Sequence, residues 1–419
     1  ALKGQWEKKN YIDPKLYKEY NVKRGLRDED GRGVLTGLTR VGEIQSYSVT
    51  EGEHIVPQDG MLYYRGIDCR ELVKGSEGRR FAFEETAYLL LFGELPTAAQ
   101  LEAFCQQLAS YRTLPTNFFR DVIMKAPPRD LMNTMQRGIL TLFCYDDKPN
   151  DIGLENVLRQ CLQLMSNMPV LAIYAYQAWR FSQGESLFIH VPKPELSTAE
   201  NFLRMLREDC SYTDLEARTL DVALILHADN GGGNNSTFTT HVVTSSGIRD
   251  SSKVMAMMDN VKEHVRDWND EGCVADYLTR ILNKDAFDRS GLIYGLGHAV
   301  YTKTDPRCEV FRAYVNHLAA EKGREDELAL YANVEKIGKQ LLMERQHKSV
   351  LSTNIDFYSG FVYEMLGLPK ELYTPLFAVA RIAGWSAHRM EELSVGGKLI
   401  RPRYECVEEH RPYTSMDRR

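Results

Sequence analysis

Two short segments in the C-terminal half of the chain carry side chains that could perform acid–base chemistry. The first reads Gly-Leu-Gly-His298-Ala-Val-Tyr-Thr-Lys-Thr-Asp-Pro-Arg307 and places an imidazole in a glycine-flanked turn, with an arginine close behind. The second reads Asn-Ile-Asp356-Phe-Tyr-Ser-Gly and places a carboxylate in a similar turn, with Arg381 following on an apolar stretch. A base, a proton donor and two anion clamps are therefore available, because the planar fork of arginine matches a carboxylate in two hydrogen bonds.

Taken one at a time, these residues also have ordinary structural interpretations. A single histidine in a glycine-rich turn is more often a structural hydrogen-bonding group, a single aspartate more often caps a turn, and a single arginine is usually solvated. The functional interpretation therefore depends on the ordered set. A further glycine run at residues 231–233 does not indicate a phosphate-binding loop, because no Lys-Ser/Thr pair follows it and a predicted helix precedes it.

The composition is that of an ordinary globular protein. The chain has 419 residues, of which 43% are apolar, so two or three domains are expected rather than one core. The net charge is −6 and no long basic tract occurs, which argues against a dedicated binder of nucleic acid or of an anionic membrane. Any binding of anions must therefore be local.

Cysteine spacing and the first residues bear on the cellular compartment. The 8 cysteines show no CxxC pair and no Cys/His zinc spacing, so they are expected to be reduced thiols. Residues 1–20 lack the apolar core of a signal peptide, and no window is long and apolar enough to span a membrane. A cytoplasmic location is the expectation, with a processed organellar protein as the open alternative.

Helices are predicted to dominate from Phe83 onward, so the expected fold class is mainly α. Before that point, short β-branched runs at residues 33–41 and 60–66 predict small hairpins. Apolar periodicity and helix breakers predict helices over residues 84–92, 121–143, 155–181 and 213–226. The last of these opens with capping-box spacing and is apolar almost all round, which predicts a buried helix.

A second group of helices is predicted over residues 252–365. Apolar residues recur there at helical spacing, namely Val254, Met258, Val261, Val265 and Trp268, and further along Leu328, Tyr331, Val334, Ile337 and Leu341. His264 falls in the middle of the first of these predicted helices and is expected on the surface. This grouping, rather than any sharp linker, sets the expected domain boundary.

In this order, the chemical motifs resemble those of the citrate synthase family. The resemblance rests on the stretch from His298 to Arg307, the stretch around Asp356, Arg381 before Gly-Trp, and Arg401-Pro-Arg. Earlier segments are similar as well: Tyr-Arg-Gly at residues 64–66, the helical run at 83–96, and His-Ala-Asp with Asn-Asn-Ser-Thr across 227–237. The similarity therefore covers nearly the whole chain.

The resemblance implies a two-domain, mainly α homodimer with small N-terminal β hairpins. Residues 1–251 and 366–419 would form a large domain around a small domain of residues 252–365. Oxaloacetate and acetyl-CoA would meet in the cleft between them, in the citrate-forming reaction of the tricarboxylic acid cycle. Acetyl-CoA would be a substrate, and neither a permanently bound cofactor nor a metal is implied.

The resemblance also assigns roles to residues. Asp356 would take a proton from acetyl-CoA, and His298 would polarise the ketone of oxaloacetate. Arg307 and Arg381 would hold carboxylates, and Arg401 would reach into the site of the neighbouring subunit. These residue types suit the chemistry, because enolising a thioester needs a base and a donor for the developing oxyanion.

Two departures from the family pattern stand out. Family members usually carry a histidine that contacts oxaloacetate where this chain has Asn230, whose amide can donate a hydrogen bond but carries no charge. After Gly247 the family normally has a further helix and a turn whose histidine stabilises the acetyl-CoA enolate, but this sequence continues directly to Lys253. Either the protein lacks that segment, or the natural protein carries residues here that the 419-residue sequence does not include.

The leading hypothesis is a citrate synthase-type acyltransferase that condenses acetyl-CoA with oxaloacetate to give citrate and CoA. A 2-methylcitrate synthase using propionyl-CoA is a close variant that the sequence does not separate, because packing in three dimensions sets the acyl pocket. The rival hypothesis is an impaired or inactive family member that retains dicarboxylate or CoA binding, and it rests on the two departures. Assembly beyond a dimer, regulation and the pocket for the CoA adenine also stay open.

Overall fold

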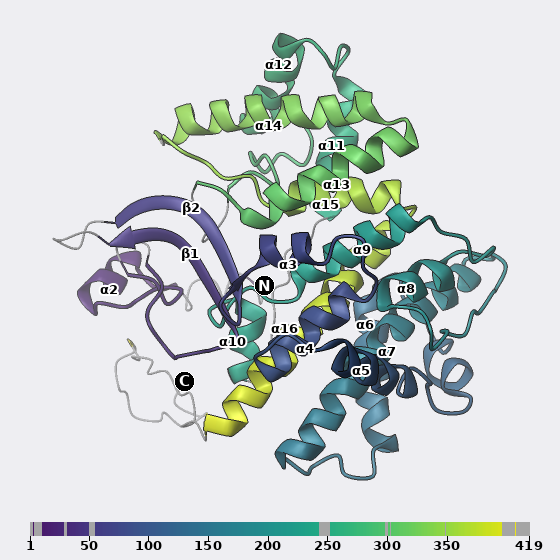
Figure 1. The fold of residues 1–419 in the computed structure, drawn as a ribbon. Coiled ribbons are helices and arrows are strands. Elements are labelled where there is room, and N and C mark those ends of the chain that lie inside the picture. Colours follow the sequence, from purple (N-terminus) through teal and green to yellow (C-terminus); the bar gives the residue numbers. More distant parts are fainter. Residues whose placement is uncertain are drawn as a thin grey trace, which may run out of the picture.

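The computed structural model of the chain is mainly helical, as the sequence predicts (Figure 1). The residues that it describes are 3, 11–28, 32–49, 55–242, 252–297, 301, 303–347, 349–395 and 407. Among the described helices, none has the length and apolar character needed to cross a membrane. The cysteines in the described part of the chain form no disulfide.

The helices fall into two runs along the chain. The first run is α2 (Pro14–Glu19), α3 (Cys69–Gly75), α4 (Ala82–Phe92), α5 (Ala98–Ser110), η1 (Phe119–Ile123), α6 (Leu131–Leu142), η2 (Phe143–Tyr145), α7 (Leu154–Ser182), α8 (Thr198–Leu206), α9 (Asp214–His227) and α10 (Asn235–Val242). The second run is α11 (Ser252–His264), α12 (Glu271–Leu282), α13 (Pro306–Lys322), α14 (Glu325–Gln346), α15 (Asp356–Met365), η3 (Lys370–Leu372) and α16 (Tyr373–Val395).

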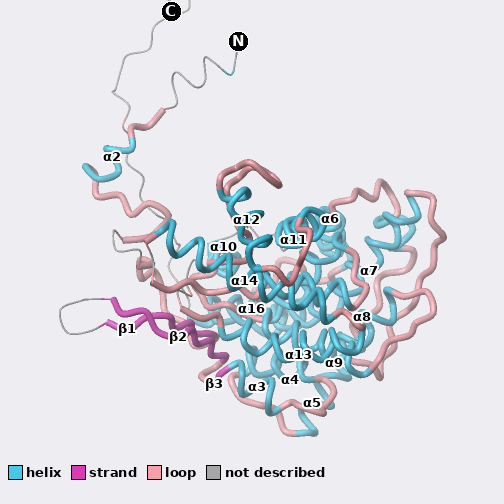
Figure 2. Tube along the Cα trace, turned by 90° about the horizontal axis from the view of Figure 1, so that it is seen from above, coloured by secondary structure: helices cyan, strands magenta, loops and turns pink. Residues whose placement is uncertain are grey.

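The strands form one small antiparallel sheet near the N-terminus. Strands β1 (Gly42–Val49), β2 (Ile55–Tyr64) and β3 (Ile67–Asp68) pair in that order, and the hairpin of β1 and β2 projects from the helical body (Figure 2). The hairpin predicted at residues 60–66 is confirmed by β2 and β3. The one predicted at 33–41 is wrong, because Leu35 and Leu38 lie exposed on an irregular segment, and only Gly33 at its start forms an isolated antiparallel bridge, with Arg27, among the described residues.

Local sequence signals account for several helix ends. Helix α4 ends where Gly93 adopts a left-handed φ of 86° and its N–H bonds to the Leu89 carbonyl. Helix α9 opens with the predicted capping box, in which Thr213 and Glu216 each accept a hydrogen bond from the other's backbone. The predictions of these two helices and of α7 are confirmed.

The helix predicted over residues 121–143 is wrong in its first part. The α-helical segment α6 begins only at Leu131, after Pro127 and Pro128 have interrupted the backbone hydrogen bonding. Asp130 caps it by accepting the Asn133 N–H at 3.3 Å. Sequence periodicity missed this break, because the apolar spacing continues across it.

Helix α16 forms the spine of the lower helical group in Figure 1, where it runs diagonally in yellow behind α4. It packs against α4, α7, α9 and α10. Nearly every residue in the second half of α9 is buried, which confirms the prediction of a buried helix. The apolar faces of α9 and α16 therefore meet, and their polar residues are brought together at the end of α9.

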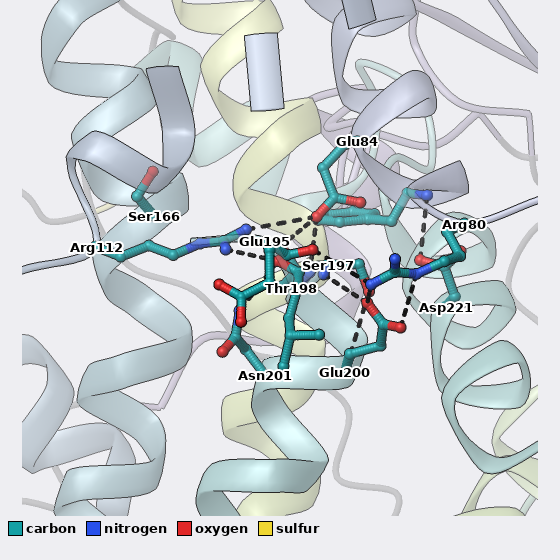
Figure 3. A network of polar contacts seen from close by, with 12 residues as sticks. Arg80, Glu84, Arg112, Ser166, Glu195, Ser197, Thr198, Glu200, Asn201 and Asp221 are labelled. Atoms are coloured by element: carbon teal, nitrogen blue, oxygen red, sulfur yellow. Dashed lines mark hydrogen bonds and ion pairs between the residues drawn. The ribbon is translucent and has the colours of Figure 1, made fainter. Parts of the chain in front are cut away.

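A buried polar network links α4 with α8 in this helical group (Figure 3). Glu84 on α4 accepts hydrogen bonds from the backbone and hydroxyl of Thr198, at 2.7 and 2.8 Å. Arg112 lies 3.8 Å from the same carboxylate and donates to the Leu196 carbonyl at 2.7 Å. Nearby, the Asp221 carboxylate accepts the N–H groups of the first turn of α4.

Helices α11 to α15 group together at the top of Figure 1. Within this group α12 packs on α14 and α13 packs on α15, while α13 also contacts α3, α9 and β2. The division into a large and a small domain stays a prediction. His264 is exposed, as expected, but it ends α11 instead of lying mid-helix.

Candidate functional site

The two sequence motifs lie side by side as paired turns. The Gly297 N–H donates to the Ser352 carbonyl at 2.7 Å, and the Asn354 N–H donates to the Gly295 carbonyl at 2.9 Å. Gly295 has a φ of 82°, and a Cβ added there would lie 2.8 Å from the Phe357 ring. Glycine is therefore required for the close approach of the two turns.

Asp305 organises the start of α13. Its carboxylate binds Arg307 through two hydrogen bonds, Nε to Oδ1 at 3.0 Å and Nη2 to Oδ2 at 2.8 Å. Oδ2 also accepts the Ile355 N–H at 3.3 Å, in the turn just before Asp356. Burial works to lower the pKa of Arg307, but the adjacent Asp305 carboxylate outweighs it and holds that pKa above its usual range.

Arg381 lies fully buried in the middle of α16. Its Nε donates to the His227 carbonyl at 2.7 Å, and its Nη1 donates to the Asn234 side chain at 3.2 Å. Nη2 has no hydrogen-bond partner among the described residues. Burial lowers the pKa of Arg381 to about 10, because the positive charge of its guanidinium group is poorly solvated there.

Asp356 is the first residue of α15 and is partly buried. Its own N–H is fixed by the Asn354 side chain at 3.2 Å. The charge of Asp356 works to raise the pKa of both Arg307 and Arg381, although burial keeps the pKa of Arg381 lowered, and Asp305 links Arg307 to the Ile355 N–H beside Asp356. The structure thus brings together the carboxylate and the two guanidinium groups that the sequence singled out.

Asn230 lies in the turn that follows α9. The residue is buried, and its side-chain oxygen has no hydrogen-bond partner in the described part of the chain. The preceding residue, Asp229, is held from two sides: its backbone N–H donates to the Tyr64 hydroxyl at 3.3 Å, and its Oδ2 accepts the Gly231 N–H at 2.9 Å. The turn that presents Asn230 is therefore fixed by its neighbours.

His227 closes the same corner of the site as a neutral ring. Burial lowers its pKa to about 3, and the charge of Arg307 acts in the same direction. Its Nδ1 lies 2.8 Å from the Ala223 carbonyl, which can only accept a hydrogen bond, so Nδ1 carries the proton. The backbone carbonyl of His227, rather than its ring, positions Arg381.

Glu335 on α14 holds the turn that carries Asp356 through hydrogen bonds to residues on either side of that aspartate. It accepts hydrogen bonds from the hydroxyl groups of Thr353 and Tyr358, the latter at 2.7 Å, and from Arg312 at 2.6 Å. Burial works to raise its pKa, but these donors and the nearby cations lower it to about 2. Glu335 is therefore an ionised anchor for the turn.

Two of the predicted site residues lie outside the described part of the chain, namely His298 and Arg401. The junction after Gly247 also lies outside it, between the end of α10 at Val242 and the start of α11 at Ser252. Among the described residues, no group of three or more His, Cys, Asp and Glu side chains is placed to hold a metal ion.

Sequence reasoning missed Asp229, Asp305, Glu335 and His388, the last a buried histidine on α16. Only Asp305 carries a local signal, since an aspartate before Pro-Arg at the start of a helix has the form of an N-cap. The other three depend on partners that are distant in sequence.

A separate cavity of about 1120 Å³ lies between α5, α6 and α7, and none of the predicted site residues lines it.

Comparison with known proteins gives a consistent result. A family profile described as "Citrate synthase, C-terminal domain" matches residues 32–403. A citrate synthase of Haloferax volcanii is 32% identical over 381 residues, which cover 86% of this chain and 93% of that protein. A 2-methylcitrate synthase of Shewanella oneidensis is 30% identical over 362 residues, which cover 83% of this chain and 88% of that protein.

Solved structures show the same likeness in three dimensions. The crystal structure of citrate synthase from Pyrobaculum aerophilum matches with a TM-score of 0.71 at 26% identity, covering 94% of this chain and 95% of that one. A ternary complex of citrate synthase from Thermoplasma acidophilum with carboxymethyl coenzyme A and oxaloacetate matches with a TM-score of 0.74. It covers 95% of this chain and 99% of that one at 21% identity, so it is a likeness of fold.

Proposed function

Because the chain belongs to the citrate synthase family of acyltransferases, we propose that it condenses acetyl-CoA with oxaloacetate to give citrate and CoA. One observation carries the proposal: Asp305 binds the buried guanidinium of Arg307 and also accepts the Ile355 N–H, so this cation lies beside the turn that carries Asp356. A dicarboxylate substrate fits two buried cations, and a base beside them fits a carbon acid.

The two arginines are suited to hold the carboxylates of oxaloacetate. Arg381 keeps Nη2 without a protein partner among the described residues, so this donor is available to a ligand. Its lowered pKa reflects a buried cation that lacks sufficient negative charge nearby, which an anionic ligand would supply. Arg307 is held in one orientation by Asp305, so little side-chain freedom is lost on binding.

Asp356 is suited to act as the base that takes a proton from the acetyl-CoA methyl group. It occupies the first position of α15, where the partial positive charge of the helix N-terminus favours the ionised carboxylate. His298 would polarise the ketone of oxaloacetate, and it directly follows Gly297, whose N–H is bonded to the Ser352 carbonyl. The enolate would attack the ketone carbon, and hydrolysis of the resulting citryl thioester would release citrate and CoA.

The departures at Asn230 and after Gly247 bear on rate. An enolate oxygen that lacks one preorganised donor reacts about 10²- to 10³-fold more slowly. If the protein lacks the segment after Gly247, we therefore expect slow turnover, and if it carries residues there that the 419-residue sequence does not include, Asn230 is the remaining departure, proposed as a neutral hydrogen-bond donor to oxaloacetate. A member that binds substrates without turnover is the alternative that these departures favour.

We further propose that the protein acts as a homodimer in which Arg401 reaches the neighbouring site. The described part of α6 and its flanks carries exposed apolar side chains that a second copy could cover. They are Leu140, Phe143, Tyr145 and Ile152. Sedimentation velocity would report the oligomer, and mixing Arg401→Ala with Asp356→Asn subunits would restore some activity only if sites are shared.

The test of the reaction compares thiol release by the unmodified protein, Asp356→Asn and Asp326→Asn. Asp326 lies exposed in the first turn of α14 and serves as the matched control. We expect Asp356→Asn to abolish CoA release while oxaloacetate binding, measured by calorimetry, persists, and Asp326→Asn to behave as the unmodified protein. Undiminished turnover in Asp356→Asn would refute the assigned base.

Two further outcomes separate the alternatives. Oxaloacetate binding without thiol release at any protein concentration would favour the binding-only member over the enzyme. The comparisons do not decide between acetyl-CoA and propionyl-CoA as the acyl donor, because a citrate synthase and a 2-methylcitrate synthase match at 32% and 30% identity. The ratio of kcat/KM for acetyl-CoA to that for propionyl-CoA decides between citrate and 2-methylcitrate synthesis.

A further inference from the structure

A fully buried histidine, His388, lies between two carboxylates beneath the turn that presents Asn230. Its Nε2 lies 3.3 Å from Asp229 Oδ1, and its Nδ1 lies 3.8 Å from Glu391 Oε2. Neither ring nitrogen has a hydrogen bond to another described residue, and besides the two carboxylates the ring packs edge to face against that of His241, with centroids 5.4 Å apart. His388 comes two turns after Arg381 on α16, on the same helix as a proposed substrate ligand.

The Asp229 carboxylate is enclosed by backbone on two sides. A Cβ added at Gly42 would lie 2.2 Å from Oδ2, and one added at Gly384 would lie 2.6 Å from Oδ1. The carboxylate therefore has no room to turn away from His388. Burial works to raise the pKa of Asp229, but contact with His388, the charge of Arg381 and the Gly231 N–H together hold that pKa below its usual range.

The ring lies closer to Asp229, where Nε2 and Oδ1 are 3.3 Å apart, than to Glu391, whose Oε2 lies at the ion-pair distance of 3.8 Å from Nδ1. Glu391 is fixed in turn, because its Oε1 accepts the Arg40 N–H at 2.7 Å. The ring thus bridges the N-terminal segment and α16 on one side to the end of α9 on the other.

We propose that His388 is a positioning residue for oxaloacetate, which acts by holding Asp229 and thereby the turn that carries Asn230. The end of α9 and the same turn supply the two contacts of Arg381, the His227 carbonyl and the Asn234 side chain. The inference rests on the proposed function, and its effect is confined to the oxaloacetate side of the site.

The experiment is the substitution His388→Gln, compared with His317→Gln on the exposed face of α13. The Gln amide can donate to Asp229, but its oxygen would face the Glu391 carboxylate without a donor between them. We expect the oxaloacetate KM and its Kd from calorimetry to rise about tenfold, which corresponds to about 1.4 kcal/mol. The KM for acetyl-CoA is expected to stay near that of the control, while the Tm is expected to fall, because the Asp229 and Glu391 carboxylates lose their shared partner.

A second variant, His388→Gln with Glu391→Gln, provides a rescue. The new amide at position 391 keeps an oxygen for the Arg40 N–H and adds a donor toward position 388. We expect its oxaloacetate KM to lie between those of the unmodified protein and the single variant, still several-fold raised because a flexible amide does not hold Asp229 as firmly as the rigid imidazole ring does. If the single variant does not fold, this double variant carries the test, and an unmodified oxaloacetate KM in it would overturn the inference.

The remaining outcomes are distinct. If the unmodified protein binds oxaloacetate and His388→Gln binds it equally, the role of His388 is overturned while the proposed function stands. If His388→Gln loses Tm and affinity for both substrates together, the residue is only structural and the inference is overturned. If the unmodified protein binds no oxaloacetate at all, the proposed function fails and the inference fails with it.

Discussion

Asp305 and Arg307 form a two-pronged pair at the start of α13, with nitrogen–oxygen distances of 3.0 and 2.8 Å. Both side chains are buried, so the pair is shielded from solvent. The same carboxylate accepts the Ile355 N–H, which links the arginine to the turn ahead of Asp356. One aspartate thus sets the relative position of a proposed substrate clamp and the proposed base.

We predict that Asp305→Asn weakens oxaloacetate binding by roughly 10- to 100-fold, because hydrogen bonds to a charged group contribute about 1.5–3 kcal/mol. Asparagine keeps the N-cap but presents an N–H group to one guanidinium nitrogen. Asp270→Asn is the matched control, since Asp270 caps α12 by accepting the Gly272 N–H and lies exposed. Calorimetry with both variants checks the prediction, and equal affinities would contradict it.

Gly295→Ala should open the pairing of the two turns. The residue has a positive φ of 82°, and its Cβ would meet the Phe357 ring at 2.8 Å. Gly323→Ala is the control, because Gly323 also has a positive φ but no atom lies within 4 Å of its Cβ position. We expect Gly295→Ala to lose roughly 1–3 kcal/mol more unfolding free energy than the control, measured by urea denaturation, and to lose thiol release as well.

The chemical residues could be predicted from the sequence because they sit in short motifs. His298, Arg307 and Asp356 each occur in a glycine- or proline-marked turn, and such turns signal themselves locally. The mainly α class was predictable for a similar reason, since apolar periodicity is a local property. Their roles stay predictions, and His298 lies outside the described residues.

The supporting residues could not be predicted, because their environment is created by folding. Glu335 lies on a helix that reads as amphipathic, and a glutamate there is usually solvated. His388 and Asp229 are more than 150 residues apart, and neither is chemically distinctive until α9 and α16 meet. The break before α6 was missed for a different reason: two prolines overrode an apolar pattern that continues through them.

The raised pKa of the buried Asp221 carboxyl group predicts that the free energy of unfolding falls as pH rises. Burial and the neighbouring Glu84 raise its pKa to about 7, well above the ordinary pKa of an aspartate (Figure 3). Between these values the folded state holds a proton that the unfolded state has lost, so unfolding free energy falls by up to about 1.4 kcal/mol per pH unit. The stabilisation is present below the unfolded pKa and is lost as pH rises through the folded one.

Asp221→Asn should therefore flatten the pH dependence of stability between about pH 4 and 7. The amide keeps one acceptor for the N–H groups of Ala82 and Phe83 and loses the other, so stability at pH 4 should fall. The measurement is urea unfolding at several pH values. An unchanged slope in the variant would show that another group titrates.

Arg381→Lys tests whether geometry or charge dominates at the dicarboxylate site. The guanidinium donates hydrogen bonds from Nε to the His227 carbonyl and from Nη1 to the Asn234 side chain, which leaves Nη2 for the ligand. Lysine keeps the charge but cannot reach two protein acceptors and a ligand with a fixed fork. We expect oxaloacetate affinity to fall by at least about tenfold, while an affinity close to that of the unmodified protein would show that charge alone suffices.

The pH dependence of binding gives an independent test of the same residue. The pKa of Arg381 is lowered to about 10, and an anionic ligand beside it raises that pKa, so binding and protonation favour each other. Affinity for a stable dicarboxylate analogue should therefore be constant below about pH 9 and weaken as pH rises through 10. Lysine at this position, with the same burial and an ordinarily lower pKa, should begin to lose affinity at lower pH. Identical pH profiles for the two proteins would show that the ligand does not contact residue 381.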